Sequence, residues 1–328
     1  MPTNLPPEYF EIEKRYRAAR STADKIACLE ELLSVVPKHK GTDRLRGDLR
    51  RKLSKLRTAP RGQKGASRRE SAFRIDREGA GQAVVVGPTN VGKSALVTAL
   101  TNATPQVAAA PYTTWEPTPG MMPVEDIQIQ LVDTPPLDGE YIEPELFDLI
   151  RRSDLILLVV DLQTDPFGQL EDAIALLEEH RIVPDHLQDR YAGESSLTFV
   201  PLLMLVNKVD DERSDEDFQI FGALLEEDWP LLPVSATTGR NLERFKQAVF
   251  ERLGIIRVYS KPPGQEPDLG APFVLKKGTT VEELAGEIHK DFVENLKSAR
   301  IWGSALYDGQ MVPRDHVLED GDVVELRI

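Results

Sequence analysis

The octapeptide GPTNVGKS, at positions 87–94, limits what this chain can fold into more than any other stretch. It directly follows the apolar run QAVVV and opens the helical pattern KSALVTAL. A strand, a glycine-rich loop and a helix in this order are the context that the phosphate-binding pattern G-x-x-x-x-G-K-S requires. The glycines allow the backbone to wrap around phosphates, and the N-terminus of the helix adds a favourable dipole. The sequence therefore predicts a P-loop; the alternative is a glycine-rich turn without a ligand.

The side chains of this loop have separate predicted roles. Lys93 would reach the β- and γ-phosphates of a nucleotide, and Ser94 would hold Mg²⁺. The loop residues predicted to contact the nucleotide are Gly87, Asn90, Val91, Gly92, Lys93, Ser94 and Ala95.

Short apolar runs alternate with helical patterns along the middle of the chain. Three runs are continuously apolar, which predicts parallel strands buried on both faces. A fourth, IQIQLVD, alternates, which predicts a strand nearer a sheet edge. This alternation of strands and helices predicts a doubly wound α/β domain with a mostly parallel sheet over residues 80–258. The strands are expected at 82–87, 127–133, 154–161 and 199–207, and the helices at 93–100, 169–180 and 241–254.

The tetrapeptide NKVD, at 207–210, indicates which base is bound. It ends an apolar strand, at the carboxyl edge where α/β sheets bind ligands. Asp210 can accept hydrogen bonds there from guanine N1–H and N2–H. Adenine has no matching donors, so Asp210 would be left unpaired beside ATP. Asn207 would tie the surrounding loops together, and the stem of Lys208 would pack over the base.

A second segment completes the predicted base pocket. SATTG, at 235–239, follows the next expected strand, LLPVS. Ser235 and the backbone N–H of Ala236 are expected to line the pocket. The two segments favour GTP and GDP as ligands, and an ATPase in which Asp210 plays no part in nucleotide preference is the competing prediction.

The N-terminal part is basic and has a helical pattern. Apolar residues recur three or four apart from Ile12 to Leu33 and again from Leu45 to Leu56, with the turn-forming VPKHKGT between them. This predicts a helical hairpin and a flexible linker over residues 1–70. Residues 1–75 contain 19 Lys+Arg and 9 Asp+Glu, a net +10, so the rest of the chain has −14 − 10 = −24. The basic arm is either a solvated helix face or a contact for RNA or ribosome phosphates.

The C-terminal part is predicted to be a small separate domain at 271–328, after the Pro/Gly linker KPPGQEPDLGAP. Thr280 and Glu283 match a capping box that opens a helix. The buried stripe of that helix would be Leu284, Ile288, Phe292 and Leu296. Asp320-Gly321 predicts a turn before a last strand, VVELRI.

The composition excludes several classes of protein. The longest purely apolar run, LILLVV, is far shorter than a membrane span, and the N-terminus lacks the apolar core of a signal peptide. The single cysteine, Cys28, excludes a disulfide framework and suits the cytoplasm, and the five scattered histidines indicate no structural metal site. We therefore expect a cytoplasmic protein that does not enter a membrane.

Taken together, these motifs resemble the P-loop GTPases of the Obg superfamily, and within it the developmentally regulated GTP-binding branch. PKHKGTDRLRGDLRRKLSKLR resembles the helical region before that family's G domain, and PYTTWEPTPG resembles its switch I. GIIRVYSKPPGQEPD, FVLKKGTTVEELAGEIHKDF and LEDGDVVEL resemble its passage into a TGS domain, which implies a β-grasp fold at the C-terminus. Two family features are missing. Asn207 follows Asp133 by 207 − 133 = 74 positions, too few for the domain that eukaryotic and archaeal members insert, and the glycine-rich domain of Obg itself is absent.

The resemblance implies further site residues. Thr114 matches the switch I threonine that joins the Mg²⁺ shell in the GTP state, with Thr113 as the alternative. Asp133 would hold Mg²⁺ through water. Asn90 matches a P-loop asparagine that helps to bind K⁺ in several related GTPases, where the ion supplies charge that others take from an arginine finger. The alternative for Asn90 is a hydrogen bond within the loop.

The segment LVDTPPLDG, at 131–139, departs from the family pattern D-x-P-G. Pro136 replaces the glycine whose N–H senses the last phosphate, and proline has no N–H. Three consequences compete: the N–H of Leu137 or Gly139 takes over, the affinity for the γ-phosphate falls, or the protein binds GDP and GTP with little switching. Leu137 also stands where Ras-like enzymes have a water-orienting glutamine, and a hydrocarbon cannot position water.

The sequence therefore predicts a GTPase with slow intrinsic turnover that regulates a ribosome- or RNA-associated process, with Lys93 and Thr114 as its catalytic residues. The alternative is a guanine-nucleotide-binding scaffold with negligible hydrolysis, because of Pro136 and Leu137.

Overall fold

The computed structural model describes residues 72–101, 116–139 and 141–327, together with positions 12, 15, 28, 29, 31–33, 35 and 36 of the N-terminal part. The chain divides into two compact units, Met1–Arg69 and Glu70–Ile328.

In the first unit, the described positions are helical apart from Val36, and Ile12, Leu29 and Leu32 are buried, as the periodicity predicts. Arg15 also pairs with Glu31 at 2.9 Å. The second arm, 45–56, lies outside the described residues.

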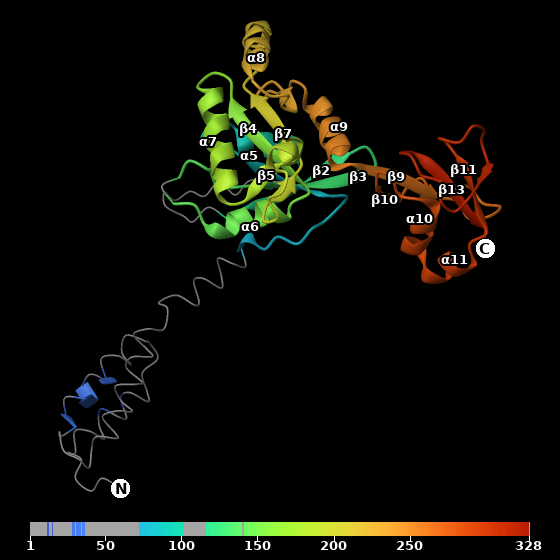
Figure 1. Cartoon of the computed structure of the whole chain (residues 1–328), viewed down its shortest axis with the longest axis horizontal. Coiled ribbons are helices and arrows are strands. Elements are labelled where there is room, and N and C mark those ends of the chain that lie inside the picture. The colour runs from blue at the N-terminus through green and yellow to red at the C-terminus, as the bar shows by residue number, and fades with distance from the viewer. Residues whose placement is uncertain are drawn as a thin grey trace. The chain divides into compact units, whose positions relative to one another are not determined.

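The larger unit contains a six-stranded sheet (Figure 1). Every neighbouring pair of strands is parallel except the hairpin of β2 and β3 at one edge. The order across the sheet is β2 (Thr118–Val124), β3 (Ile127–Asp133), β1 (Gln82–Val86), β4 (Leu155–Asp161), β7 (Leu202–Asn207) and β8 (Leu231–Pro233).

Both faces of this sheet are buried by helices. Successive residues of β1 alternate between two hydrophobic clusters: Val84 and Val86 pack on one side, Ala83 and Val85 on the other. The first cluster includes residues of α6 (Pro144–Arg152), α7 (Pro166–Glu179) and α8 (Glu212–Leu224). The second includes residues of α5 (Lys93–Leu100) and α9 (Leu242–Leu253). The predicted doubly wound α/β architecture is confirmed.

Some elements escape the sequence patterns for identifiable reasons. Strand β2 contains two prolines and a glycine, which an edge strand tolerates because it leaves N–H groups unpaired on one side.

The run 199–207 divides at Pro201 into β7 and the short β6 (Thr198–Val200), which pairs with β5 (Ile182–Pro184) in a separate two-stranded sheet. A 3₁₀ helix, Asp185–Tyr191, follows β5. Helix α8 is strongly acidic, but Asp211 and Ser214 form a capping box that starts it.

The C-terminal sheet has five strands, in the order β10 (Phe273–Lys276), β9 (Ile255–Ser260), β13 (Asp322–Arg327), β11 (Ser298–Trp302) and β12 (Gln310–Val312). Residues 255–258 are predicted to belong to the preceding domain, but β9 is hydrogen-bonded to β10 and β13 and so belongs to this sheet. The linker at 261–272 is therefore a connection inside the C-terminal domain. The parallel pairing of β9 with the last strand agrees with the β-grasp fold.

The predicted capping box of Thr280 and Glu283 is present and starts α10 (Val281–Ile288). The predicted single helix ends there, because His289 is extended at φ −167° and ψ 144°, and α11 (Lys290–Asn295) follows. Leu284 and Leu296 are still buried in the core of the domain, with Ile288 and Phe292 packed against it.

A charged cluster joins this domain to the β2–β3 hairpin. Arg257 on β9 pairs with Asp320 at 2.7 Å and with Asp126 at 3.0 Å, and Tyr259 donates to Asp126 at 2.5 Å. Since β3 ends at Asp133, one strand runs from this contact to the predicted magnesium side of the nucleotide site.

No helix in the described part of the chain is long and apolar enough to cross a membrane.

Candidate nucleotide site

Four parallel strands end at one edge of the six-stranded sheet and bring the predicted site residues together. The P-loop follows β1, Asp133 ends β3, Asp161 ends β4 and Asn207 ends β7. Because open α/β sheets bind ligands at the carboxyl ends of their strands, this edge is where a nucleotide is expected. Thr114 and its neighbour Thr113 lie outside the described residues.

The P-loop requires glycine at two positions. Gly92 has φ +96°, and a Cβ there would lie 2.3 Å from Asn207 Nδ2. Gly87 has φ +145°, and a Cβ there would lie 2.4 Å from the carbonyl oxygen of Val159. Both conformations favour glycine, and both Cβ atoms would collide with fixed polar groups. The loop is therefore shaped by its backbone, as a phosphate-binding loop must be.

Lys93 lies folded over this loop. Its Nζ donates to the carbonyl oxygens of Gly87, at 2.8 Å, and Pro88, at 2.7 Å. Burial lowers the pKa of Lys93 to about 8, although the nearby carboxylates of Asp133 and Asp138 oppose the shift. The ammonium is thus held at the phosphate loop in a place where a further anion would stabilise it.

Asp133 is buried beside the start of helix α5. Ser94 Oγ donates to its Oδ2 at 2.5 Å, while its Oδ1 is buried and has no hydrogen-bond partner. Burial raises the pKa of this carboxyl group, against the opposing effects of the Ser94 hydrogen bond and the Lys93 charge. A buried carboxylate oxygen without a partner is costly, and a cation bound beside Ser94 would satisfy it.

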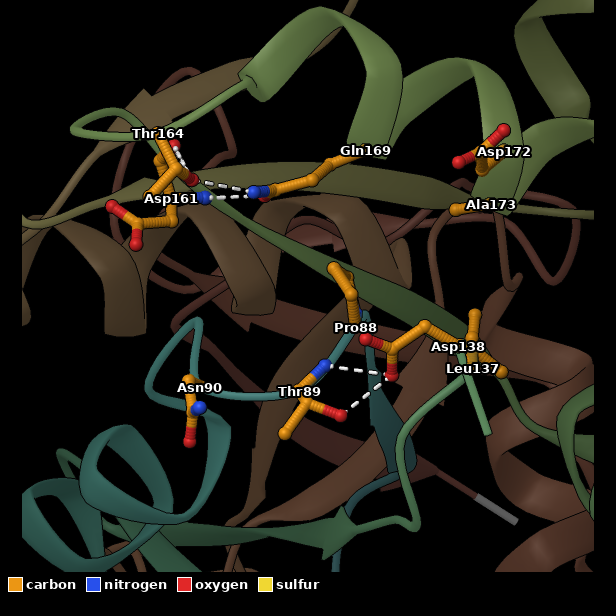
Figure 2. Close-up of a pocket in the computed structure, with 10 residues that line it drawn as sticks. All are labelled: Pro88, Thr89, Asn90, Leu137, Asp138, Asp161, Thr164, Gln169, Asp172 and Ala173. Carbon is orange, nitrogen blue, oxygen red and sulfur yellow. Dashed lines mark hydrogen bonds between the residues drawn. The ribbon is translucent and has the colours of Figure 1, made fainter. Parts of the chain in front are cut away.

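The segment after Asp133 is attached to the P-loop. The N–H of Leu137 donates to the carbonyl oxygen of Gly87 at 3.1 Å, and the Leu137 side chain is buried in the hydrophobic core. Asp138 Oδ1 accepts two hydrogen bonds from Thr89, one from its N–H at 2.8 Å and one from its hydroxyl at 2.7 Å (Figure 2). Partial burial by itself raises the pKa of Asp138, but the Thr89 hydrogen bonds and the Lys93 charge bring it below its usual value.

A cavity of about 420 Å³ opens beside this attachment. The P-loop and the segment after Asp133 form one side, and the end of β4 and the start of α7 form the other (Figure 2). Three carboxylates line it, those of Asp138, Asp161 and Asp172. It extends the nucleotide site on the side of switch II.

The base end is organised by Asn207. Its Nδ2 donates to the carbonyl oxygen of Val91 in the P-loop at 2.7 Å, and its Oδ1 accepts from the N–H of Ala236 at 3.2 Å. Asn207 therefore ties the two loops together, as expected. The N–H of Ala236, which is predicted to line the base pocket, donates to Asn207 instead.

Asp210 and Lys208 lie beside Asn207. Ser235 Oγ donates to Asp210 Oδ1 at 2.6 Å, and Gln163 Nε2 approaches Asp210 Oδ2 at 3.3 Å. Lys208 adopts φ +66°, and its Nζ pairs with Asp161 at 2.5 Å. These contacts fix the carboxylate and extend the lysine stem across the base end of the site.

Sequence reasoning missed four residues of this site. Asp161 ends an apolar strand in the same way as Asp133 and Asn207, so its position could have been noticed. The contact of Gln163 and the pairing of Thr89 with Asp138 depend on how loops meet, for which the sequence has no periodic signal.

Comparisons with known proteins agree with this geometry. Residues 82–188 match the family model described as 50S ribosome-binding GTPase, and residues 256–328 match the TGS domain. A GTP-binding protein of Methanocaldococcus jannaschii is 32% identical over 366 aligned positions, which cover 93% of this chain and 92% of the relative. This chain belongs to the P-loop GTPases of the developmentally regulated G-protein type with a TGS domain. It is therefore a GTP-binding protein of the GTPase class.

Two further relatives have informative names. Developmentally-regulated G-protein 2 of Arabidopsis thaliana is 26% identical, with 92% of this chain and 90% of the relative covered. Ribosome-interacting GTPase 1 of Saccharomyces cerevisiae is 26% identical, with 93% and 99% covered. The alignment with the archaeal relative spans 366 positions, more than the 328 residues of this chain, so that relative has segments that this G-protein lacks. This agrees with the short distance between Asp133 and Asn207.

The lowered pKa of Lys93 predicts proton uptake on nucleotide binding. A bound phosphate favours the ammonium form, so the pKa of Lys93 should rise on binding. Protons are then taken up at any pH at which Lys93 is partly neutral in the nucleotide-free protein. Because the pKa of free Lys93 is about 8, GDP binding at that pH should take up about half a proton, falling towards zero near pH 6.5. Calorimetry in two buffers of different ionisation enthalpy measures this uptake. The Lys93→Arg variant keeps its charge and should lose the effect; equal uptake in both proteins would contradict the assignment.

Proposed function

We propose that this protein binds GTP and GDP with Mg²⁺ and hydrolyses GTP slowly. The observation that carries the proposal is the position of Asp210, whose carboxylate is fixed by Ser235 at 2.6 Å next to an asparagine that is hydrogen-bonded to the P-loop. One rigid frame thereby presents a phosphate-binding loop and an acceptor for guanine N1–H and N2–H. An adenine in the same place would leave Asp210 desolvated and unpaired.

The magnesium assignment is supported by the donor set. Asp133 has a buried oxygen without a partner, and Ser94 is hydrogen-bonded to the other oxygen of the same carboxylate. Oxygen ligands of this kind suit a hard cation. Ser94 and Asp133 would hold the ion, with Thr114 added from switch I. When bound, the ion would neutralise charge on the β- and γ-phosphate oxygens.

The proposed hydrolysis is in-line attack of water on the γ-phosphate, with Lys93 stabilising the charge that develops. Turnover would be slow for two reasons. Pro136 has no N–H to donate, and Leu137 is a buried hydrocarbon that cannot orient water. The N–H of Gly139, which follows the turn at 137–138, is the proposed contact for the γ-phosphate after a small loop shift. Asn90, exposed at φ +62°, is the candidate for K⁺ binding.

A second candidate function is a nucleotide-dependent scaffold with negligible hydrolysis. The contact that favours it is the hydrogen bond from the Leu137 N–H to the Gly87 carbonyl, because this amide is thereby withheld from the phosphate. In that case GTP and GDP bind, but the difference between the two states is small.

Ribosome association in the cytoplasm is proposed on three grounds. One relative is named a ribosome-interacting GTPase, and the matching family model is described as a 50S ribosome-binding GTPase. The first 75 residues have a net charge of +10, which suits an RNA phosphate backbone. The basic N-terminal arm and the TGS domain are the proposed contact surfaces.

Guanine preference is tested by Asp210→Asn. This variant replaces one acceptor oxygen by a donor that faces the donors of guanine, so the preference for GTP over ATP should fall about 100-fold. Competition against a fluorescent GDP measures the preference. Glu212→Gln, an exposed neutral substitution two residues away, is the matched control and should leave it unchanged. An unchanged preference in Asp210→Asn would favour the ATPase prediction.

Turnover distinguishes the enzyme from the scaffold. Phosphate release from GTP should be slow in Na⁺ buffer, faster with K⁺ or ribosomes, and abolished by Lys93→Ala, because this variant removes the cation at the terminal phosphates. Release that is absent under every condition, while GTP and GDP still bind, would support the scaffold. Release that survives Lys93→Ala would exclude this site as its source.

The ribosome proposal predicts a salt-dependent interaction. Co-sedimentation with ribosomes should weaken steadily as salt rises, because phosphate contacts release counterions. Deleting residues 1–70 should lower the binding and flatten its salt slope. An unchanged slope after the deletion would contradict a role for the basic arm.

A further inference from the structure

Asp138 places an anion on the loop that binds anions. Its Oδ1 accepts from both the N–H and the hydroxyl of Thr89, at 2.8 and 2.7 Å. Backbone N–H groups of a P-loop ordinarily bind phosphate oxygens. In this structure one of them is satisfied by a carboxylate from the segment that follows Asp133 (Figure 2).

This carboxylate lies on the terminal-phosphate side of the site. Thr89 is bonded in sequence to Pro88, whose carbonyl oxygen holds the Lys93 ammonium at 2.7 Å. Lys93 is the group that reaches the β- and γ-phosphates in such loops. Asp138 itself belongs to the segment that senses the last phosphate in related switches. A γ-phosphate bound here would therefore meet the Asp138 charge, whereas a β-phosphate lies deeper in the loop.

The backbone beside Asp138 is anchored to the P-loop and to the core. The Leu137 N–H is bonded to the Gly87 carbonyl at 3.1 Å, and the Leu137 side chain is buried, 7% exposed, in the hydrophobic core. Pro136 restricts the backbone just before it. The anchored backbone thus presents the carboxylate to Thr89, and rotation of the exposed Asp138 side chain is sufficient to displace it.

We propose that Asp138 is a specificity-determining residue that sets the preference between GDP and GTP: its carboxylate occupies the Thr89 donors in the GDP-bound and free protein, opposes the γ-phosphate, and is displaced when GTP binds. The carboxylate thereby makes nucleotide affinity depend on the γ-phosphate without the amide that Pro136 lacks. This inference rests on the proposed function, since it requires that the site binds guanine nucleotides.

The opposite arrangement makes a different prediction. If Asp138 stayed on Thr89 with GTP bound, it would help to hold switch II closed over the γ-phosphate. Removing its charge would then lower the affinity for GTP or leave it unchanged. The two arrangements therefore predict different changes in the ratio of GTP affinity to GDP affinity: a rise for the proposed arrangement, and a fall or no change for the other.

The test is Asp138→Asn in the full chain. Asparagine keeps an acceptor for Thr89 but removes the negative charge, and Asp138 is exposed, so the fold should be retained. Fluorescence titrations with Mg²⁺ measure the affinities for GDP and for a non-hydrolysable GTP analogue. We expect the affinity for the analogue to rise about tenfold relative to that for GDP, since neutralising one nearby charge removes a repulsion of that order. Thr89→Val, which loses the hydroxyl donor, should shift the ratio in the same direction by a smaller factor.

Asp172→Asn is the matched control. Asp172 lines the same cavity, but no hydrogen bond joins it to the P-loop among the described residues. This variant should leave the ratio within about twofold of the wild type, because the charge is solvent-screened. A ratio that is unchanged or lowered in Asp138→Asn would overturn the proposal, as would an equal rise in Asp172→Asn. If the wild type bound neither nucleotide, the proposed function itself would fail. That result is distinct from one in which both nucleotides bind but Asp138→Asn leaves the ratio of their affinities unchanged.

Discussion

The site depends on one side chain that is hydrogen-bonded at both ends. Asn207 donates to the Val91 carbonyl in the P-loop and accepts from the Ala236 N–H in the loop that follows β8. Its amide nitrogen also occupies the space that a Cβ at Gly92 would need. Since Asp210 follows three residues later, Asn207 fixes the separation between the phosphate loop and the proposed base acceptor. Recognition of a whole nucleotide requires both the P-loop and Asp210 to keep this relative position.

A second consequence concerns the electrostatics of the phosphate end. Lys93, Asp133 and Asp138 form a group of three charges at the P-loop, and the two carboxylates oppose the burial that lowers the pKa of Lys93. The ammonium itself donates to the carbonyl oxygens of Gly87 and Pro88. The unpartnered oxygen of Asp133 can accept a cation, whereas Asp138 already accepts hydrogen bonds from Thr89. The same site thus has one carboxylate suited to a cation and another that competes with the ligand.

Much of this could be predicted from the sequence, and the reasons are physical. The strands and helices of the G domain follow from short apolar runs, and the P-loop and NKVD motifs have few meanings in that context. Helix α10 was identifiable from Thr280 and Glu283 because a capping box is local chemistry. Strand β2 was not, since its prolines are acceptable only at an edge that the sequence does not mark. The assignment of β9 failed for a similar reason. A proline-rich segment indicates that a strand ends there, but it does not indicate which sheet the strand joins.

The switch segment shows the limit of such reasoning most clearly. From the sequence, Pro136 signals a missing donor and Leu137 a missing glutamine. Only the structure reveals that the Leu137 amide is bonded to Gly87 and that Asp138 lies on Thr89, because these contacts link residues about 50 positions apart without any pattern between them.

The most direct test of the central claim is competition for the purified wild-type protein between fluorescent GDP and unlabelled nucleotides. The account predicts that GTP and GDP displace the probe and that ATP does not at comparable concentration. Equal displacement by ATP, or no binding of the probe with Mg²⁺ present, would contradict it.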